Sequence, residues 1–459
     1  MMTNAQTSTS GLTRLRELTR NVEQLAGFDQ VTRALQEKQP VTIDGVWGSA
    51  CALMAATLAR QNPPLLVVVC PHPREMDQFV DDLALFIDAE TTIFPAWDAP
   101  VSGDDLLNET YGDRLRTLKH LLQLQERLEG DQEDSSLPQV VVTSIQSLLN
   151  PVPPREELLG NSRSVAVGDR LDLEAWLDWL VTHGFHATSA VNLVGEFSSR
   201  GGIVDLFAPD WDGPVRIELF DDEVESIRRF DLVSQRSLES LQQVEITVPG
   251  TTPTDQEFFT SYLPADTWVL QLASDEAETT VAQYLARLGE ASSLHDLDQV
   301  RQHLQQFGMA QCWALAPGDI DTVMHLSMES VERFSGDMDQ VRSQLDHIGQ
   351  DQELFLVGAT QVDLERLGRI LGEMQVASAR QIHYVLGSLS NGFRLVDTNT
   401  LMISINELFQ RTEVRRPQRR RQGRAIDSFL DLRQGDLVVH LSHGVGRYRG
   451  LQLIAREGE

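Results

Sequence analysis

The stretch PVTIDGVWGSACALMAATLAR, residues Pro40 to Arg60, decides the fold expected for the first part of the chain. A short apolar strand, Pro40 to Asp44, is followed by a glycine-containing turn and then by a helix-forming run from Ala50 to Arg60. Strand, glycine turn and helix in this order form the usual setting in which proteins hold nucleotide phosphates. The stretch therefore predicts the scaffold of a nucleotide-binding α/β domain.

The same stretch lacks the residues that perform nucleotide chemistry. A loop of the form G-x-x-x-x-G-K-[S/T] needs a lysine for the β- and γ-phosphates and a hydroxyl for Mg²⁺. Here the second glycine is replaced by Ala50, the lysine by Cys51 and the hydroxyl residue by Ala52. Backbone N–H groups at the helix N-terminus could still bind a phosphate, so residual nucleotide binding is one possibility. The alternative is that the glycines only form a tight turn, and we expect neither hydrolysis nor useful nucleotide binding. The degenerate loop comprises Gly45, Gly48, Ser49, Cys51 and Ala52.

Composition sets broad limits on the protein class. The 459 residues suggest about three domains, and 41% hydrophobic residues suffice for substantial cores. A net charge of −30 argues against general nucleic-acid binding, because phosphate contacts need Lys and Arg. The 3 cysteines form no C-x-x-C pair, which is typical of a reducing compartment. No signal-peptide core or membrane-length apolar run is readable, so we expect a soluble, cytoplasmic protein without membrane contact.

Strand-like and helix-like patterns alternate over the first 150 residues. Short β-branched runs bounded by Pro or Gly are typical of buried strands, and their alternation with helices predicts a parallel sheet covered on both faces. The polar segment 130–136 is interpreted as a disordered excursion. The expected strands are 41–43, 65–70, 91–94 and 140–143, and the expected helices are 74–87 and 104–128.

The pattern changes after the prolines at 151, 153 and 154. A helix over 171–183 and strands over 201–207, 215–220, 223–230 and 244–248 predict a small α+β module. Residues 253–334 have a mixed, helix-rich pattern, and 354–409 again resemble a compact α/β unit. The arginine-rich stretch 411–424 has no apolar face and predicts an exposed linker. A strand over 435–440 is followed by a turn and a second short strand. Two strands cannot form a stable sheet alone. We therefore expect a truncated last domain in the front part of a longer protein.

Three stretches, in this order, resemble the bacterial transcription-repair coupling factor family. The degenerate nucleotide domain of that family is matched by FPAW at 94–97 and RLRTL at 114–118, although the proline-tyrosine step that usually follows the tryptophan is missing. Residues 435–451 are similar to its polymerase-interacting barrel. The most specific stretch resembles the module that the family shares with the excinuclease protein UvrB. It comprises GEFSSRGGIVDLF at 195–207, PVRIELFDDE at 214–223, IRRFD at 227–231 and SQRS at 234–237.

This resemblance implies a multidomain α/β fold. The chain would begin with a degenerate P-loop (RecA-like) parallel sheet over 12–150, followed by an inserted α+β module over 151–249 that binds the excinuclease protein UvrA. The remainder of the UvrB-like module would occupy 250–335, and a small α/β domain 336–410. A basic linker over 411–426 would lead to the start of a truncated SH3-like β-barrel over 427–459.

The resemblance also implies partners. The module would recruit UvrA, the barrel would bind the β subunit of RNA polymerase, and damaged double-stranded DNA would join in the full complex. The protein is expected to be a monomer. An ATP- and Mg²⁺-dependent translocase would follow downstream, so this chain itself would be no enzyme and hold no cofactor. A C-terminal domain of the full protein would mask the UvrA-binding surface at rest, and this chain would bind constitutively.

Arg200, Arg216 and Phe220 match family positions that dock UvrA. Alternation along the strand 215–220 places Arg216, Glu218 and Phe220 on one face, and two charged residues make that face solvent-facing. Arginines beside an exposed aromatic side chain are typical of a binding hot spot. The alternative is an ordinary solvated face with Phe220 tucked against a neighbouring element.

Other candidate residues lie outside this module or beside it. Arg419, Arg420 and Arg421 could contact DNA phosphates, or the linker could be only a tether. Gly201 and Gly202 are expected to serve a turn, and the acidic run from Asp221 to Glu225 a turn and a solvated face rather than a metal cluster. His440 and His443 lack further ligands, so we expect no metal.

Two other functions stay open. The chain could be an active UvrB-like DNA helicase or ATPase, which DNA-stimulated ATP turnover would reveal. It could also be a free-standing regulator of polymerase, which the absence of a downstream motor would favour.

Overall fold

The computed structural model describes residues 11–97, 109–130, 137–247, 257–273, 277–288, 294–317, 321–331, 352–373, 382–408, 437–440, 444–447 and 449. The chain divides into two compact units, Met1–Arg415 and Arg416–Glu459, which are described separately. Among the described residues, no helix combines the length and apolarity that a membrane crossing requires.

A seven-stranded sheet, parallel throughout, organises the first unit and confirms the predicted parallel sheet. Three of its strands come from residues 268–325, a region whose sequence indicated only a mixed, helix-rich pattern. Two of these, Trp268–Gln271 and Gly308–Trp313, lie between the strands that precede and follow the glycine turn and its helix. In spatial order the strands are β15 (Met324–His325), β1 (Pro40–Asp44), β14 (Gly308–Trp313), β13 (Trp268–Gln271), β2 (Leu66–Cys70), β4 (Gln139–Ser144) and β3 (Glu90–Phe94).

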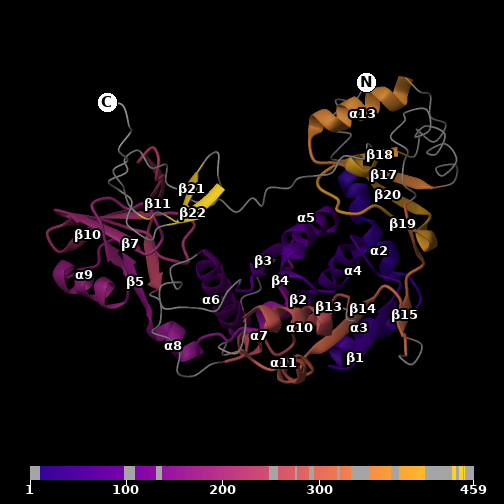
Figure 1. The fold of residues 1–459 in the computed structure, drawn as a ribbon, viewed down its shortest axis with the longest axis horizontal. Coiled ribbons are helices and arrows are strands. Elements are labelled where there is room, and N and C mark those ends of the chain that lie inside the picture. The colour runs from indigo at the N-terminus through magenta and orange to yellow at the C-terminus, as the bar shows by residue number, and fades with distance from the viewer. Residues whose placement is uncertain are drawn as a thin grey trace, which may run out of the picture. The chain divides into compact units, whose positions relative to one another are not determined.

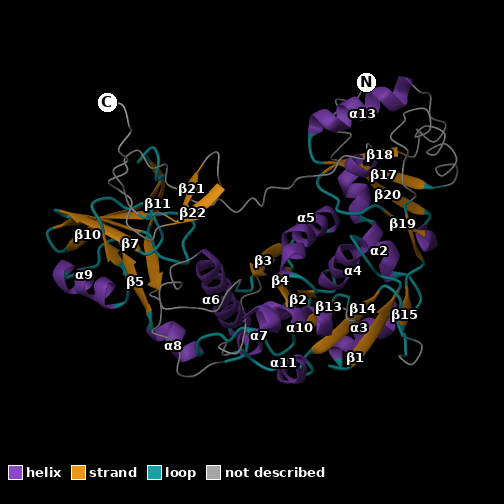
Figure 2. Cartoon of the chain, in the orientation of Figure 1, coloured by secondary structure: helices purple, strands orange, loops and turns teal. Residues whose placement is uncertain are grey.

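Helices cover both faces of this sheet (Figure 2). The helix predicted over 74–87 is a 3₁₀ turn followed by α5, and the part of the second predicted helix before 109 lies outside the described residues, as do 131–136. One face packs against α2 (Leu18–Glu23), α3 (Phe28–Gln36), α4 (Ala50–Ala59) and α5 (Met76–Phe86). The other packs against α6 (Glu109–Glu129), α7 (Ile145–Leu149), α10 (Ala277–Leu288) and α11 (Leu297–Leu304).

A six-stranded sheet is inserted between β4 and β13 of the first sheet. Its strands pair antiparallel except for β6 and β7. One face packs against helix α9 (Leu173–Thr182) and against the antiparallel pair β5 (Ser162–Ala166) and β12 (Gln243–Thr247). This is the α+β module that the sequence predicted. Its strands, in spatial order, are β11 (Ser237–Leu241), β10 (Glu223–Phe230), β9 (Val215–Phe220), β8 (Ile203–Leu206), β7 (Glu196–Arg200) and β6 (His186–Ala187).

A five-stranded mixed sheet forms the last part of the first unit. Its buried residues Phe355, Val385 and Phe393 belong to the same hydrophobic core as helices α2, α4 and α5. Helix α4 therefore lies between two sheets (Figure 1), which explains why each of its 10 residues is buried. The strands are β16 (Met328–Ser330), β19 (Phe393–Leu395), β20 (Thr400–Ser404), β17 (Glu353–Gly358) and β18 (Ile382–Leu386), with helices α13 (Gln361–Glu373) and α14 (Ile405–Leu408).

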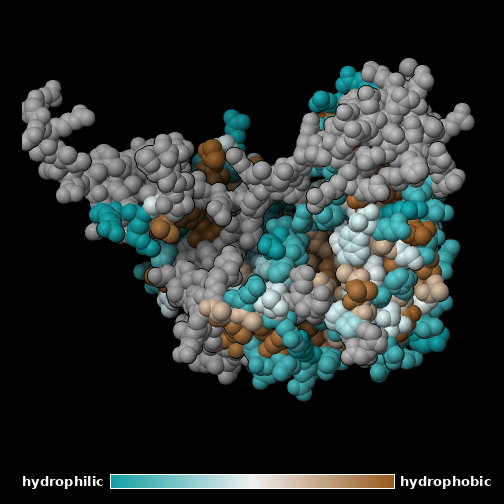
Figure 3. Space-filling view, turned by 45° about the vertical axis from the view of Figure 1, so that its right-hand side comes forward, coloured by the Kyte–Doolittle hydropathy of each residue, from teal (hydrophilic) through white to brown (hydrophobic). Residues whose placement is uncertain are grey.

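Apolar side chains also reach the surface of the first unit. Where the described surface is coloured in Figure 3, brown hydrophobic residues are scattered among teal hydrophilic ones. Leu315 and Val362, for example, are 83% and 71% exposed. Single exposed apolar residues are normal in soluble proteins. Exposure alone therefore does not mark a binding site, and the neighbours of an exposed apolar residue have to be considered.

The second unit contributes one described hairpin. Strands β21 (Leu437–His440) and β22 (Gly444–Arg447) pair antiparallel. The rest of the predicted SH3-like barrel, the arginine-rich linker with Arg419, Arg420 and Arg421, and His443 lie outside the described residues. The barrel therefore stays a prediction.

Candidate protein-binding site

The candidate site lies on the face of the six-stranded sheet opposite helix α9. Along β9, Val215, Ile217 and Leu219 are buried in the core, and the alternate residues Arg216, Glu218 and Phe220 point outward. Phe220 is 77% exposed. The predicted alternation is confirmed, and the alternative in which Phe220 is tucked against a neighbour is wrong.

The strand register brings Arg200 to the same face. Arg200 of β7 pairs with Ile203 of β8, and Ile203 pairs with Glu218 of β9, so the three form one cross-strand row. Arg216 and Phe220 flank Glu218 along β9. We call Arg200, Ile203, Arg216, Glu218 and Phe220 the outer face. Ile203, which is 41% exposed, was missed by the sequence because its partners become visible only with the register.

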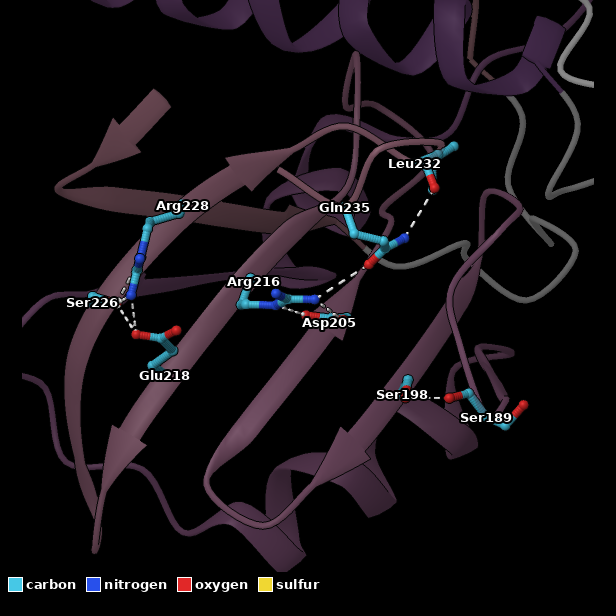
Figure 4. Close-up of polar contacts among 9 residues, drawn as sticks. All are labelled: Ser189, Ser198, Asp205, Arg216, Glu218, Ser226, Arg228, Leu232 and Gln235. Carbon is cyan, nitrogen blue, oxygen red and sulfur yellow. Dashed lines mark hydrogen bonds and ion pairs between the residues drawn. The ribbon is translucent and has the colours of Figure 1, made fainter. Parts of the chain in front are cut away.

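Arg216 is held in place by its own module. Its Nε and Nη2 donate to the two carboxylate oxygens of Asp205 at 2.7 and 2.8 Å, and Nη2 also reaches Gln235 at 3.4 Å (Figure 4). Its guanidinium lies 4.8 Å from the ring centroid of Phe230. The hydrogen bonds to Asp205 raise the pKa of Arg216. This fork geometry fixes the side chain before any partner arrives, which lowers the entropy cost of binding.

Glu218 is neutralised in a similar way. Its carboxylate accepts hydrogen bonds from the Ser226 hydroxyl, at 2.8 Å, and from Arg228 (Figure 4). The Ser226 hydroxyl and the Arg228 guanidinium lower the pKa of Glu218. Arg200, by contrast, is exposed and donates to the Ser189 carbonyl, and it has no ion pair among the residues that the structure describes. The outer face therefore offers one uncompensated cation, Arg200, and one exposed aromatic ring, Phe220.

The turns beside this face have the predicted structural roles. Gly201 has a φ of +61°, and a Cβ on Gly202 would lie 2.5 Å from the Leu219 carbonyl oxygen, so both glycines serve the turn and the close strand approach. Asp221, at φ 57°, makes the turn between β9 and β10, and Glu223 and Glu225 are exposed. No group of three or more metal-ligating side chains occurs in the part of the chain that the structure describes.

One face of helix α6 fixes the orientation of the module. Gly112 packs so closely that a Cβ there would lie 2.0 Å from the Pro209 carbonyl oxygen. Lys119, on the same face, donates to Asp210 at 2.7 Å and to Thr247 at 2.8 Å, and the side chains of the ion pair are only 13% and 5% exposed. Burial raises the pKa of Asp210, and the Lys119 ammonium opposes that rise.

We expect Lys119→Met to destabilise the chain by about 2 kcal/mol, between the values typical of surface and of buried ion pairs, because it leaves the Asp210 carboxylate buried without its cation. Urea unfolding measures the loss. Asp210→Asn in the Lys119→Met background should recover part of it. Arg116→Met, which removes solvent-accessible pairs to Asp212 and Asp113, is the matched control and should cost less than about 1 kcal/mol. Equal effects of the two single variants would contradict this account.

The glycine turn at the start of α4 has the predicted geometry. Gly45 and Gly48 have φ of +75° and +56°, as a tight strand-to-helix turn requires. Three backbone N–H groups of the loop donate inside the protein: Val46 to Trp313, Cys51 to Gly48 and Ala52 to Ser49, at 3.0 to 3.1 Å. Burial raises the pKa of the Cys51 thiol to about 12. The position of the missing lysine is thus part of the apolar core.

Comparison with protein families assigns two segments of the chain. Residues 164–251, which carry the whole outer face, match the UvrB interaction domain, and residues 432–459, which include the β21–β22 hairpin, match the CarD-like/TRCF RID domain. The fold and these two matches define a class of multidomain α/β protein that combines a UvrB interaction domain with a CarD-like/TRCF RID domain.

Within that class, the chain is similar to transcription-repair-coupling factors. It is 25% identical to that of Staphylococcus aureus (strain USA300) over 90% of this chain and 42% of the relative. It is 24% identical to that of Staphylococcus epidermidis over 91% of this chain and 42% of the relative. The resemblance indicated by the sequence motifs is confirmed. The chain spans less than half the length of these relatives.

Proposed function

We propose that this chain couples stalled RNA polymerase to nucleotide excision repair by recruiting the excinuclease protein UvrA through the outer face. The observation that carries the proposal is Phe220, a large aromatic ring left in solvent beside Arg200 and Arg216 within the UvrB interaction domain. Exposed aromatic rings next to arginines are the residues in which binding energy concentrates at protein interfaces. Because Asp205 and Glu218 already neutralise Arg216 and Arg228, the partner surface should offer a carboxylate to Arg200 and an apolar pocket to Phe220.

Isothermal titration calorimetry of purified UvrA against the full chain tests this proposal. We expect saturable binding without ATP hydrolysis by this chain and without any activating partner, since Phe220 is already exposed. Failure to bind under low-salt conditions, with both proteins folded, would contradict the proposal.

We further propose that the C-terminal segment contacts the β subunit of RNA polymerase. The support is the CarD-like/TRCF RID match over residues 432–459, and an exposed strand edge would add a strand to the partner. The arginines at 419–421 stay candidates for DNA contact within the complex with damaged DNA.

We propose that this chain itself does not hydrolyse ATP. The absence of a lysine at Cys51 and of a hydroxyl at Ala52 supports a chain without ATP hydrolysis, and an ATP- and Mg²⁺-dependent translocase is expected downstream of it. DNA-stimulated ATP turnover by the purified chain would favour the alternative, an active UvrB-like helicase. A cytoplasmic monomer is the expected state.

A further inference from the structure

The segment Gly387–Gly392, which connects β18 to β19, lies against the glycine turn of the first sheet. We call this segment the plug and Gly45–Ala52 the vestigial loop. The Asn391 N–H donates to the Ser49 hydroxyl oxygen at 2.9 Å, and the neighbouring Ser390 N–H donates to the Asp82 carboxylate at 2.8 Å. The plug is therefore anchored through its main chain to both the vestigial loop and helix α5.

Close packing accompanies these hydrogen bonds. A Cβ built on Gly48 would lie 3.6 Å from the Cβ of Asn391, which is ordinary contact distance. At the start of the turn, a Cβ on Gly45 would lie 2.2 Å from the Leu326 carbonyl oxygen. The vestigial loop thus packs against Asn391 at Gly48 and against the Leu326 main chain at Gly45.

The polarity of the contact is opposite to that of a phosphate site. A phosphate-binding loop donates N–H groups to anionic oxygens. Here Ser49 accepts, and the plug supplies the N–H donors. The Asp82 carboxylate next to it would repel a phosphate. The surroundings therefore suit a neutral peptide segment and not an anion.

The apolar core supports the same arrangement. Leu389 of the plug is buried with the α4 residues and with Phe393 in one hydrophobic cluster. Two separate domains that open and close around a nucleotide would not share a continuous core of this kind.

We infer that the vestigial loop is the docking site of the plug, an intramolecular peptide ligand that occupies the position of nucleotide phosphates and holds the five-stranded sheet on α4. The site of the lost nucleotide chemistry serves as a permanent joint. This inference is independent of UvrA binding.

The thiol of Cys51 reports on this joint, because it is only 7% exposed and lies at the vestigial loop. The experiment treats the full chain with N-ethylmaleimide and follows each of the cysteines by peptide mass spectrometry. The variant Ser49→Ala/Asp82→Ala removes the two acceptors that hold the plug to the vestigial loop and to helix α5, and leaves the acceptors within the five-stranded sheet region, Gly358 and Glu407, in place. The matched control, Ser49→Thr/Asp82→Asn, keeps an acceptor oxygen at each site.

We expect the alanine variant to label at Cys51 about 10- to 30-fold faster than the wild type, through local opening, with Cys70 and Cys312 unchanged. The control variant should remain close to the wild type. No rise at Cys51, or an equal rise at all three thiols, would overturn the inference. Millimolar MgATP should leave Cys51 labelling of the wild type unchanged, and protection by MgATP would also overturn it.

A second experiment tests the position of the plug directly, by a disulfide between the plug and the vestigial loop, without weakening their contact. Gly48→Cys with Asn391→Cys, in a Cys51→Ser background, should form a disulfide on mild oxidation, because the 3.6 Å Cβ separation lies within the disulfide range. Gly48→Cys alone controls for a side chain at positive φ. If the double variant is folded and stays reduced, the plug does not occupy the vestigial loop.

Discussion

The double variant Arg200→Ala/Phe220→Ala should weaken binding of UvrA by about 100-fold or more, and Phe220→Ala alone by about 30-fold. Phe220 is 77% exposed, so the free protein gains little from its ring, whereas a partner pocket that desolvates it gains most of its apolar area. Arg200 has no ion pair within the described part of the chain, so its charge is available to a partner carboxylate.

Calorimetry measures the change in affinity, and thermal unfolding provides the control. Both substitutions remove exposed side chains, so the free energy of unfolding should change by less than about 0.5 kcal/mol for each. Val362→Ala, at an exposed apolar residue of helix α13, is the matched variant and should bind normally. Wild-type affinity in the double variant would remove Arg200 and Phe220 from the interface.

Arg216 requires a different interpretation. Arg216→Ala would leave Asp205 without its bidentate partner and would remove the guanidinium that lies over Phe230. Loss of binding in that variant would therefore combine a lost contact with a disturbed face. Arg216→Lys should also bind weakly, because an ammonium cannot reproduce the fork geometry. Phe220 is the cleaner test.

The second large effect is expected at Arg114, which is buried and has no carboxylate partner within the described ranges of the chain. It is 4% exposed, and its guanidinium lies 4.0 Å from the ring centroid of Phe94. Its N–H groups donate to four carbonyl oxygens, those of Pro95, Ser147, Asn150 and Pro151, at 2.7 to 3.4 Å. Burial lowers the pKa of Arg114 to about 9.

Arg114→Met should destabilise the chain by about 3–5 kcal/mol, because buried carbonyls lose their donor at the point where the chain enters the inserted module. Arg114→Lys should recover little, since one ammonium cannot reach the same set of carbonyls. Urea unfolding gives the difference. Arg127→Met, at an exposed arginine of the same helix, is the control and should cost less than about 1 kcal/mol. An Arg114→Met effect as small as the control would contradict this account.

The sequence allowed prediction of what local pattern determines. The strands before α6 follow from short β-branched runs bounded by turn residues, and the outward alternation of Arg216, Glu218 and Phe220 follows from a period-two pattern. Strands β13 and β14 were missed because four to six mainly apolar residues without alternation do not separate a buried strand from a short helix. Their insertion between β1 and β2 is a matter of tertiary pairing that no local pattern contains.

The same limit applies to the candidate site and to the plug. Ile203 joins the outer face only through its register with Arg200 and Glu218. The Asp205 partner of Arg216 likewise depends on cross-strand pairing. Ser49 and Asn391 are separated by 342 residues, so the loss of the phosphate-loop lysine was visible in the sequence and the segment that covers the loop was not.

Hydrogen–deuterium exchange of the full chain with and without saturating UvrA tests the central claim most directly. We predict slowed exchange in residues 199–206 and 215–228, the strands and turns of the outer face, with unchanged exchange in α9 on the opposite side of the module. Protection confined to other segments, with the outer face unchanged in a saturated complex, would contradict the claim.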